Sequence, residues 1–597
     1  MSPASSPYRP RHTGAWRAPE PEEETDSPPA EPQEAAASHL PKQGMAAASA
    51  LMAAGTLVSR GLGFLRAFLL AIAIGSTTLM ADVFEKANSV PNVIYVLLLG
   101  GMFNVVLVPQ LIKAAKQPDR GADYTSRLLT LAVIVMGVAT VLITAAAYPI
   151  ISALTLDWTE PMLALGTAFA MWTLPQIFFY GLYAVVGQIL NANAKFGWYM
   201  WAPVLNNIIA IGFILTYIVS FGAYSAEDNQ AAEWTTTQTI WLAGGHTLGV
   251  IAQALLLLWP LSKLGIGLRP KFGFRGMGLG QTGKIAAWTL GAMAVGNISN
   301  LLHMRLISGA TASREQMETG GAAVPGETAA NIAELIVLLP HSVFVLTIAT
   351  VLFNQLSRAM DLKQYDDAMG LVNRGLRIFA IPIMFSAVAM IVLAGPLGRL
   401  FGGTAADAHL AGAAIGQLLV LYAVALPFRS ANFYLMRTFY AAEDARTPMV
   451  VYSICSALSL AIAYTGAALL ANEHLPYFII GLFGAINVLQ YVFWHVLVVR
   501  RWGSFGFTDV LGAYTRAGFA ALAAGASGAG VLALLGGYTW GFAWSSLPTT
   551  ILSCAATGIV MAGVYVVALR VMRVREFDEF LEPLARRVPA LQRFQRA

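Results

Sequence analysis

Charged side chains inside long apolar stretches are the residues of this sequence that could do chemistry. Eight of them lie in or beside such stretches: the bases Arg60, Arg66, Lys86, Arg305 and Arg429, and the acids Asp82, Glu85 and Glu334. Charge is costly within hydrocarbon, so these residues usually face a cavity or one another. Guanidinium groups offer forked donors that match phosphate or carboxylate oxygens. The pattern predicts a polar cavity that receives an anionic group.

The spacing of Arg60 and Arg66 leaves two arrangements open. Six residues on a continuous helix separate their directions by about 120°, whereas a break at Gly61 or Gly63 would let both side chains reach one cavity. Arg60 could instead reach the membrane surface or pair with Asp82. Asp82 could in turn cap the helix that it begins.

The composition indicates that lipid surrounds most of the chain. Of its 597 residues, 57% are hydrophobic and only 12% are charged, whereas about a quarter of the residues in a soluble domain are charged. A chain this apolar could not cover its own surface with polar atoms. Residues 1–44 differ, because they are rich in proline and glutamate. They predict a disordered cytoplasmic tail and not a signal peptide.

Apolar stretches long enough to cross about 30 Å of hydrocarbon recur along the chain. They predict about fourteen spans, at 46–75, 79–112, 128–153, 161–190, 201–222, 236–262, 282–308, 329–353, 374–398, 408–436, 447–471, 475–499, 513–536 and 547–572. With a cytoplasmic N-terminus, this count places nineteen Lys and Arg residues in inner loops and two in outer loops. The positive-inside rule requires such an asymmetry. We therefore expect a multi-pass protein of the bacterial cytoplasmic (inner) membrane with both termini in the cytoplasm.

Two halves of the chain repeat one another in the same direction. Pro91 corresponds to Pro340 and Pro175 to Pro427, at an offset of about 250 residues. Parallel repeats of this kind surround an axis normal to the membrane, with the pathway between them. We predict an all-α fold of two six-helix bundles and two extra C-terminal helices. The predicted divisions after the first tail are 45–265, 282–500, an extra hairpin at 510–573, and a basic cytoplasmic tail at 574–597.

Other chemistries find little support in the sequence. The phosphate-binding motif Gly-x-x-x-x-Gly-Lys-[Ser/Thr] is absent, and no His, Cys and acid cluster has metal-site spacing. Cys455 and Cys554 lie far apart in apolar stretches, so we interpret them as packing residues. We expect no enzymatic activity, no catalytic residue, no metal, no cofactor and no nucleic-acid partner. Uphill transport would need an ion gradient, the membrane potential or a partner protein.

Residues 59–66 carry both arginines of the first span, and Ala81-Asp82, Pro91-Asn92 and Val108-Pro109 follow them along the chain. In this order the segments resemble the MurJ/MviN lipid II flippases. The most specific segments are 201–207, which contains Pro-Val-Leu-Asn-Asn, and 439–448, which contains Ala-Ala-Glu-Asp-Ala-Arg-Thr-Pro. The resemblance covers most of residues 45–500. It implies the twelve-span, two-bundle fold of multidrug and polysaccharide exporters, with two further spans typical of this family.

The resemblance also implies a cargo: lipid II, an undecaprenyl diphosphate bearing a disaccharide-pentapeptide. It would pass from the inner to the outer leaflet by alternating access, for cell-wall synthesis. Arg60, Arg66 and Asp82 match family positions, and Arg305 and Glu334 lie near its charged positions in spans 7 and 8. These five are the expected substrate-binding residues. Membrane lipids and cell-wall or division proteins are further expected partners.

The sequence departs from the family pattern at several cationic positions. Tyr95 and Val96 stand where the family usually has a basic pair, and Leu335 follows Glu334 where an arginine is usual. Three alternatives stay open: a flippase for another undecaprenyl-linked glycan, a cation-coupled drug antiporter, and a non-transporting MurJ-like scaffold. The antiporter would favour carboxylates over arginines in the membrane, and the arginines found here argue against it.

Overall fold

The computed structural model describes residues 42–97, 111, 114, 119, 121–193, 195–225, 234–273, 279–316 and 323–577. Within these residues the chain is helical and has no β-strand, and twelve helical segments are long and apolar enough to cross a membrane. The predicted spans 79–112 and 282–308 are not among the twelve, although helices α3 (Leu79–Leu97) and α13 (Leu279–Ile307) lie there. The all-helical membrane fold is confirmed, while the count of fourteen spans stays a prediction.

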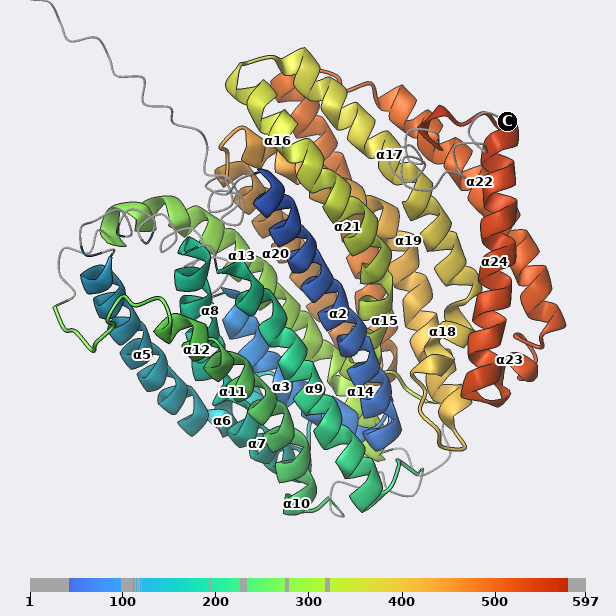
Figure 1. The fold of residues 1–597 in the computed structure, drawn as a ribbon. Coiled ribbons are helices and arrows are strands. Elements are labelled where there is room, and N and C mark those ends of the chain that lie inside the picture. Colours follow the sequence, from blue (N-terminus) through green and yellow to red (C-terminus); the bar gives the residue numbers. More distant parts are fainter. Residues whose placement is uncertain are drawn as a thin grey trace, which may run out of the picture.

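The first half of the chain forms the helices coloured blue to green in Figure 1. They are α2 (Lys42–Ile74), α3, α5 (Ala122–Ala145), α6 (Ala147–Ala153), α7 (Glu160–Thr173), α8 (Gln176–Ala192), α9 (Phe196–Phe221), α10 (Thr236–Thr239), a π-helical turn (Ile240–Gly244), α11 (Gly245–Leu256) and α12 (Leu258–Ser262). Only the last three residues of the predicted tail 1–44 are described, and they begin α2.

The second half forms the helices coloured light green to orange, and an extra hairpin follows in red (Figure 1). They are α13, α14 (Gly309–Gln316), α15 (Glu327–Pro340), a π-helical turn (His341–Leu346), α16 (Thr347–Asp361), α17 (Tyr365–Val392), α18 (Ala394–Leu400), α19 (Ala408–Ala441), α20 (Arg446–Leu469), a 3₁₀ turn (Asn472–His474), α21 (Leu475–Trp502), α22 (Phe507–Leu534), α23 (Phe542–Ser545) and α24 (Leu547–Val571).

Separate apolar cores explain why the halves form two bundles. A large cluster that includes Phe379, Tyr434 and Trp494 draws all its buried residues from 304–510. Two other clusters come from the first half, with Ala312 as the one buried residue of the second half among them. A fourth cluster packs α22 and α24 against α17. The observed arrangement is therefore two bundles plus an added hairpin at the outer edge of the second (Figure 1).

Small residues allow the tightest helix contacts. A Cβ atom on Gly398 of α18 would lie 2.1 Å from the carbonyl oxygen of Gly412 on α19, and one on Gly416 would lie 2.7 Å from the carbonyl oxygen of Ala394. Backbones approach this closely in membrane bundles, where packing contributes much of the association energy. Large apolar side chains instead cover the outside: Val219 is 87% exposed and Leu534 is 89% exposed. Such a surface suits lipid and not water.

Candidate functional site

Asp82 connects the two bundles. Its side chain is buried, and its two carboxylate oxygens accept hydrogen bonds of 2.8 Å from the Thr311 hydroxyl and of 2.8 Å from the backbone N–H of Thr328. Thr328 is the second residue of α15, so Asp82 meets an N–H group that has no partner within its own helix. A carboxylate at this place also interacts favourably with the positive end of the helix dipole. Asp82 therefore supports α15 of the second bundle.

Lys86 and Glu327 form a buried ion pair between the same helices. The Lys86 ammonium lies 2.6 Å from the Glu327 carboxylate, and each side chain is 2% exposed. The ammonium also donates to the carbonyl oxygen of Met304 on α13, at 3.2 Å. Removing one member of such a pair leaves an uncompensated buried charge, which costs about 3–5 kcal/mol. The pair therefore fixes α3 against both α13 and α15.

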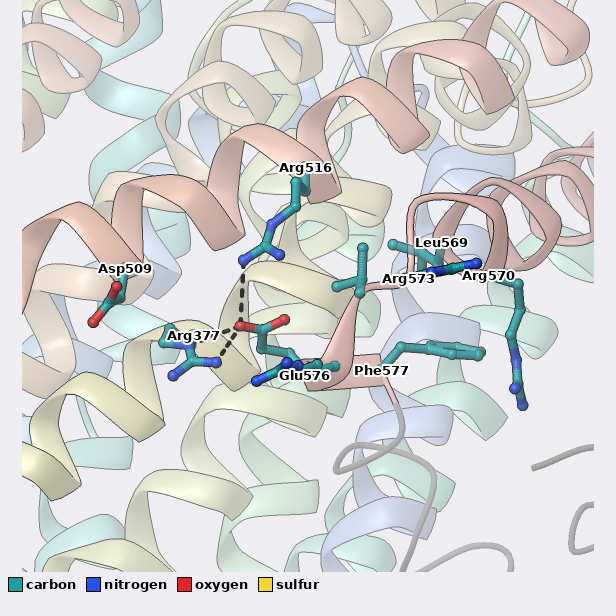
Figure 2. A pocket seen from close by; sticks show the side chains of 10 residues that line it. Arg377, Asp509, Arg516, Leu569, Arg570, Arg573, Glu576 and Phe577 are labelled. Atoms are coloured by element: carbon teal, nitrogen blue, oxygen red, sulfur yellow. Dashed lines mark hydrogen bonds and ion pairs between the residues drawn. The ribbon is translucent and has the colours of Figure 1, made fainter. Parts of the chain in front are cut away.

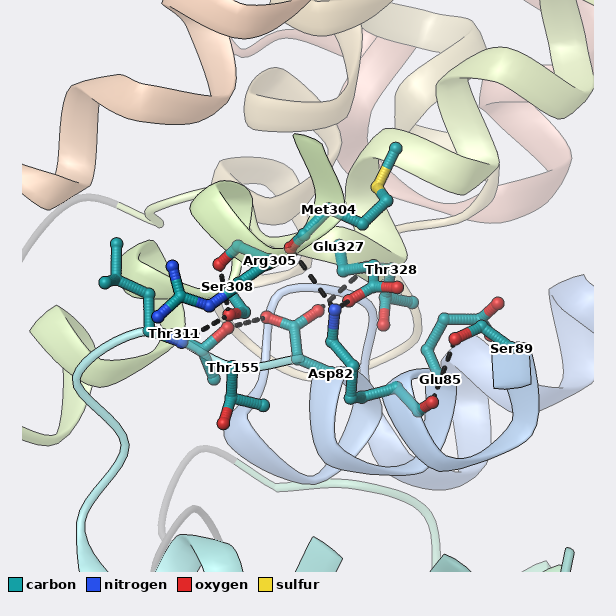
Figure 3. A network of polar contacts seen from close by, with 12 residues as sticks. Asp82, Glu85, Ser89, Thr155, Met304, Arg305, Ser308, Thr311, Glu327 and Thr328 are labelled. Atoms are coloured by element: carbon teal, nitrogen blue, oxygen red, sulfur yellow. Dashed lines mark hydrogen bonds and ion pairs between the residues drawn. The ribbon is translucent and has the colours of Figure 1, made fainter. Parts of the chain in front are cut away.

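Glu85 adds a third polar contact on this face of α3. Its carboxylate accepts a hydrogen bond of 3.0 Å from the Asn331 side-chain amide. Residues 82, 85 and 86 share one helical face because they are spaced by three and four positions. We call the six residues Asp82, Glu85, Lys86, Glu327, Thr328 and Asn331 the interbundle seam. Figure 3 labels four of them: Asp82, Glu85, Glu327 and Thr328. The seam joins the start of α3 to the start of α15.

Loops and helix ends extend the contact at this end of the bundles. The Trp158 indole donates to the carbonyl oxygen of Ser308 at 3.0 Å, and the backbone N–H of Leu156 donates to the Ser308 hydroxyl at 3.1 Å. Arg305 belongs to this region, because its Nε donates to the carbonyl oxygen of Ala153 at 3.1 Å. The same end of the molecule is therefore closed by contacts from several elements.

A polar cavity of about 320 Å³ lies directly beside the seam, and we call it the central cavity. Its lining comes from both bundles: Arg66, Glu85, Asn88, Ser89, Asn92, Val93, Gln176, Tyr180, Asn206, His246, Val250, Asn300, Leu301, Met304, Glu327 and Asn331. Three of these residues, Glu85, Glu327 and Asn331, also belong to the seam. Movement of the seam must therefore change the shape of the cavity.

Arg66 is the cation of the central cavity whose side chain is available to a ligand. Its positive charge interacts electrostatically with Glu85, Tyr180 and His246. These three residues line the cavity together with Arg66. Within the part of the chain that the structure describes, however, its guanidinium makes no hydrogen bond or ion pair. A half-buried guanidinium with open donors is suited to a phosphate or carboxylate.

A second cavity, of about 420 Å³, lies inside the second bundle and contains Glu334. The Glu334 carboxylate is 2.9 Å from the Arg429 guanidinium, which stands over the Phe483 ring. Asn300 and Met304 of α13 line both cavities. Arg429 of α19 is thus the ion-pair partner of Glu334 inside the second bundle. The sequence did not predict this pair.

Arg60 and Arg66 do not share a cavity. Of the two arrangements that the sequence left open, the structure has the continuous helix, because α2 runs without a break from Lys42 to Ile74. The two side chains therefore point in different directions, and Arg60 is exposed. Its charge still reaches His341, which lines the second cavity. Of the residues expected to bind substrate, Arg66 lines the central cavity and Glu334 lines the second cavity. Arg60 and Arg305 line neither of the two.

An aromatic stack occupies the place where the family pattern would have a basic pair. The Tyr95 ring stacks on Tyr180 at a centroid distance of 4.7 Å and lies 6.3 Å from Tyr183. Tyr180 in turn lines the central cavity. The side chain at 95 therefore extends an apolar and aromatic wall where a cation would have been a second anchor for an anion.

The two most specific sequence segments have structural partners. In the first segment, Asn206 donates to Gln253 at 3.0 Å and Asn207 donates to the carbonyl oxygen of Ser59 at 3.1 Å, which ties α9 to α11 and α2. In the second, Asp444 accepts from the backbone N–H of Thr447 at 3.0 Å and pairs with Arg501. Burial opposes ionisation of Asp444, but these hydrogen bonds and the arginine leave its pKa below the usual value.

Sequence reasoning missed Glu327 and Asn331 as members of the site. Glu327 opens a helix after Gly326, a position at which a carboxylate is common for purely local reasons. Nothing in its spacing points to Lys86, which is far away in the chain. Among the described residues, no group of three or more His, Cys, Asp or Glu side chains could hold a metal ion.

Comparisons with known proteins agree on one family. Residues 70–564 match the family described as "Lipid II flippase MurJ". A relative from Rhizobium meliloti named "Probable lipid II flippase MurJ" is 26% identical over 420 residues, which are 69% of this chain and 73% of that protein. A "Lipid II flippase MurJ" from Burkholderia cenocepacia is 26% identical over 408 residues, which are 66% of this chain and 73% of the relative.

Solved structures agree on the fold. One described as "Lipid II flippase MurJ, inward closed conformation" superposes with a TM-score of 0.63 at 19% identity, over 87% of this chain and 99% of that one. An inward-facing transporter of the multidrug resistance MATE family has a TM-score of 0.58 at 14% identity, over 74% of this chain and 95% of its own. At these identities the likeness concerns the arrangement of helices.

Proposed function

The chain belongs to the MurJ family of lipid II flippases, and we propose that it carries lipid II from the inner to the outer leaflet of the bacterial cytoplasmic membrane. The observation that carries this proposal is the open guanidinium of Arg66 in a polar cavity between two bundles. Transport of this kind moves a molecule without making or breaking its covalent bonds. We therefore propose a transporter without enzymatic activity.

The proposed orientation places both termini in the cytoplasm. The distribution of Lys and Arg in the loops supports it, and α2 begins at the end of the molecule at which α24 finishes (Figure 1). In this orientation the interbundle seam lies toward the outside of the cell. The protein would then be closed to the outside and would receive its cargo from the cytoplasmic leaflet.

Arg66 is proposed to bind the diphosphate of lipid II. An anion that leaves water for a low-dielectric site needs a compensating charge and hydrogen bonds. Arg66 offers both, and the amides of Asn88, Asn92 and Asn300 line the same cavity and can bind sugar or peptide groups. About 320 Å³ is near the lower limit for a small-molecule pocket. A disaccharide-pentapeptide needs more room, so the bundles must separate when it enters.

The isoprenoid tail is proposed to stay in contact with lipid along the added hairpin. An apolar cavity of about 560 Å³ lies between α17, α19, α21 and α22, and its lining includes Phe428, Tyr491, Tyr514 and Phe519. Aromatic and aliphatic walls of this kind suit a prenyl chain, which gains nothing from polar partners. During transport the headgroup would then lie in the polar central cavity, while the tail would stay in contact with lipid.

Alternating access would require the seam to open. Opening separates Lys86 from Glu327 and Asp82 from Thr328, whose contacts are replaced by water on the outer side. Because Glu85, Glu327 and Asn331 line the central cavity as well, a bound headgroup can compete for these contacts. An ion gradient or the membrane potential would supply any uphill work. Cell-wall or division proteins are proposed as partners.

The test is a leaflet-specific assay of lipid II in cells that depend on this protein. A membrane-impermeant probe of lipid II labels only the outer leaflet, and depletion should lower the labelled fraction. Arg66→Ala should reproduce depletion at a normal protein level, whereas Arg358→Gln, at an exposed position outside both cavities, should behave as wild type. Unchanged labelling upon depletion would contradict the proposal. Growth and normal labelling with Arg66→Ala would favour a scaffold.

A further inference from the structure

A basic pocket of about 690 Å³ lies at the far edge of the second bundle, where α24 ends. Five arginines and two carboxylates line it: Arg377, Arg516, Arg570, Arg573, Arg575, Asp509 and Glu576. Its side chains come from α17, α22, the end of α24 and the turn that follows it, and none of them lines the two cavities described above. We propose that this arginine pocket binds the phosphate group of an anionic membrane lipid.

Glu576 organises one side of the pocket. Its side chain is 1% exposed, and it accepts a hydrogen bond from Arg377 Nε at 2.8 Å while the Arg516 guanidinium lies 3.7 Å away. Figure 2 shows Glu576 between these two arginines, which come from different helices. The carboxylate compensates part of their charge and holds their planes in place. Their remaining N–H donors are thereby oriented before any ligand arrives.

Arg573 and Arg575 supply positive charge for which the described residues offer no direct partner. Within the described part of the chain, neither side chain makes a hydrogen bond or an ion pair. Asp509 is the remaining acid in the lining. The pocket therefore has a clear excess of positive charge and open guanidinium donors, which match the oxygens of a phosphate group.

The segment that carries these arginines is held in a fixed place. The turn after α24 is closed by a hydrogen bond of 3.1 Å from the Val574 N–H to the Leu569 carbonyl oxygen. Val574 is 3% exposed and Phe577 is 5% exposed, because both belong to the apolar cluster between the hairpin and α17. The arginines therefore alternate with anchored apolar side chains. A preformed site loses less conformational entropy upon binding than a free basic tail does.

The position of the pocket favours a lipid over a soluble ligand. Val571, the last residue of α24, is 77% exposed, and Phe519 of α22 is 66% exposed, so the hairpin presents apolar surface to hydrocarbon directly beside the pocket. Leu376 and Thr515, the neighbours of Arg377 and Arg516, line the apolar cavity between α17 and α22. A lipid whose phosphate lies at the arginines would thus find apolar surface nearby for its acyl chains. Basic side chains at a membrane surface attract anionic headgroups.

The experiment measures lipid binding to the full-length protein in detergent, with cardiolipin, phosphatidylcholine and inorganic phosphate as separate probes. Cardiolipin should bind and raise the unfolding temperature, and phosphatidylcholine should not. The double variant Arg573→Gln/Arg575→Gln should bind cardiolipin about tenfold more weakly or worse, because basic groups near a membrane surface attract anionic headgroups. A matched control, Arg358→Gln/Arg500→Gln, removes two exposed arginines outside the pocket and should bind as wild type does.

The probes separate the two sources of phosphate. Cardiolipin binding that inorganic phosphate does not displace at millimolar concentration supports the lipid. Saturable binding of inorganic phosphate without cardiolipin binding would overturn the lipid assignment. Equal weakening in the control variant would also overturn it, because the effect would then be one of net charge.

A chemical measurement on the wild-type chain avoids any dependence on the stability of the variants. Phenylglyoxal should modify Arg573 and Arg575 less when cardiolipin is bound, and peptide mass spectrometry reads each position. Equal modification with and without cardiolipin would contradict a site in this pocket. Neither measurement depends on lipid II transport, so the pocket and the proposed function can fail separately.

Discussion

The ammonium of Lys86 lies 2.6 Å from the carboxylate of Glu327, and both side chains are buried between two bundles that have separate apolar cores. This pair, together with the contacts of Asp82 and Glu85, closes the central cavity at one end. A transport cycle that opens this end must break the pair. Its strength therefore sets part of the difference in free energy between the closed and open states.

Lys86→Met should lower stability far more than the double variant Lys86→Met/Glu327→Met. The single variant leaves a buried carboxylate without its partner, at about 3–5 kcal/mol, whereas replacing both members by apolar residues is often neutral. Thermal unfolding of the purified proteins measures the difference. Additive losses from the two substitutions would show that the pair is not coupled.

The substitution of Arg66 should separate charge from geometry. Arg66→Lys keeps a positive charge but loses the forked donors, so it should retain part of the lipid II transport. Arg66→Glu should lose transport, because it places a negative charge where the diphosphate is proposed to bind. The impermeant-probe assay in cells with matched protein levels compares them. Equal activity of both variants would remove the anchor role of Arg66.

Charge reversal should reveal whether the Glu334–Arg429 pair acts as a unit. Either Glu334→Arg or Arg429→Glu places two like charges together in the second cavity and should impair function and lower the unfolding temperature. The double reversal restores opposite charges at the two positions, whose native side chains lie 2.9 Å apart, and should recover much of the loss. Growth of dependent cells and thermal unfolding provide the readouts. No recovery in the double variant would indicate that each residue acts separately.

Acid should weaken the contact that Glu576 makes with Arg377 and Arg516. Burial opposes ionisation of Glu576, but the hydrogen bonds and the two arginines lower its pKa below the usual glutamate value. A lowered folded-state pKa gives a stabilisation that is complete above the unfolded value, about 4.3, and is lost as the pH falls further.

The difference in unfolding temperature between wild type and Glu576→Gln should therefore be constant from pH 7 to about pH 5 and should shrink below about pH 4.3. The measurement is a series of thermal unfolding curves on the two proteins in the same detergent. A difference that grows on acidification would contradict the assignment of the charged form.

The sequence alone predicted the positions of the membrane-spanning helices better than the contacts between them. The apolar stretch 547–572 nearly coincides with α24, and 447–471 nearly coincides with α20, since length and hydropathy determine where a chain can cross lipid. The repeat predicted two bundles, and the apolar cores separate accordingly. The orientation and the boundaries of the divisions stay predictions.

Contacts between the bundles could not be predicted in the same way. Lys86 and Glu327 come from different halves at places that the repeat does not relate, and no periodicity joins them. The arginine pair of the first span was expected to share a cavity if the helix broke, but alanine, leucine and phenylalanine maintain α2 across Gly61 and Gly63. Arg305 was expected to bind substrate, and its observed partner is a backbone carbonyl of Ala153.

A reversible lock across the closed end tests the central claim most directly. A Cβ atom on Gly309 would lie 3.0 Å from Cδ2 of Leu156, so Leu156→Cys/Gly309→Cys brings two thiols of different bundles near one another for cross-linking by oxidation, in a chain whose Cys455 and Cys554 are replaced by alanine. The impermeant-probe assay then follows lipid II in the outer leaflet. We predict that oxidation stops transport and that a reductant restores it, while each single cysteine variant is unaffected. Continued transport by the fully cross-linked protein would contradict alternating access through this end of the molecule.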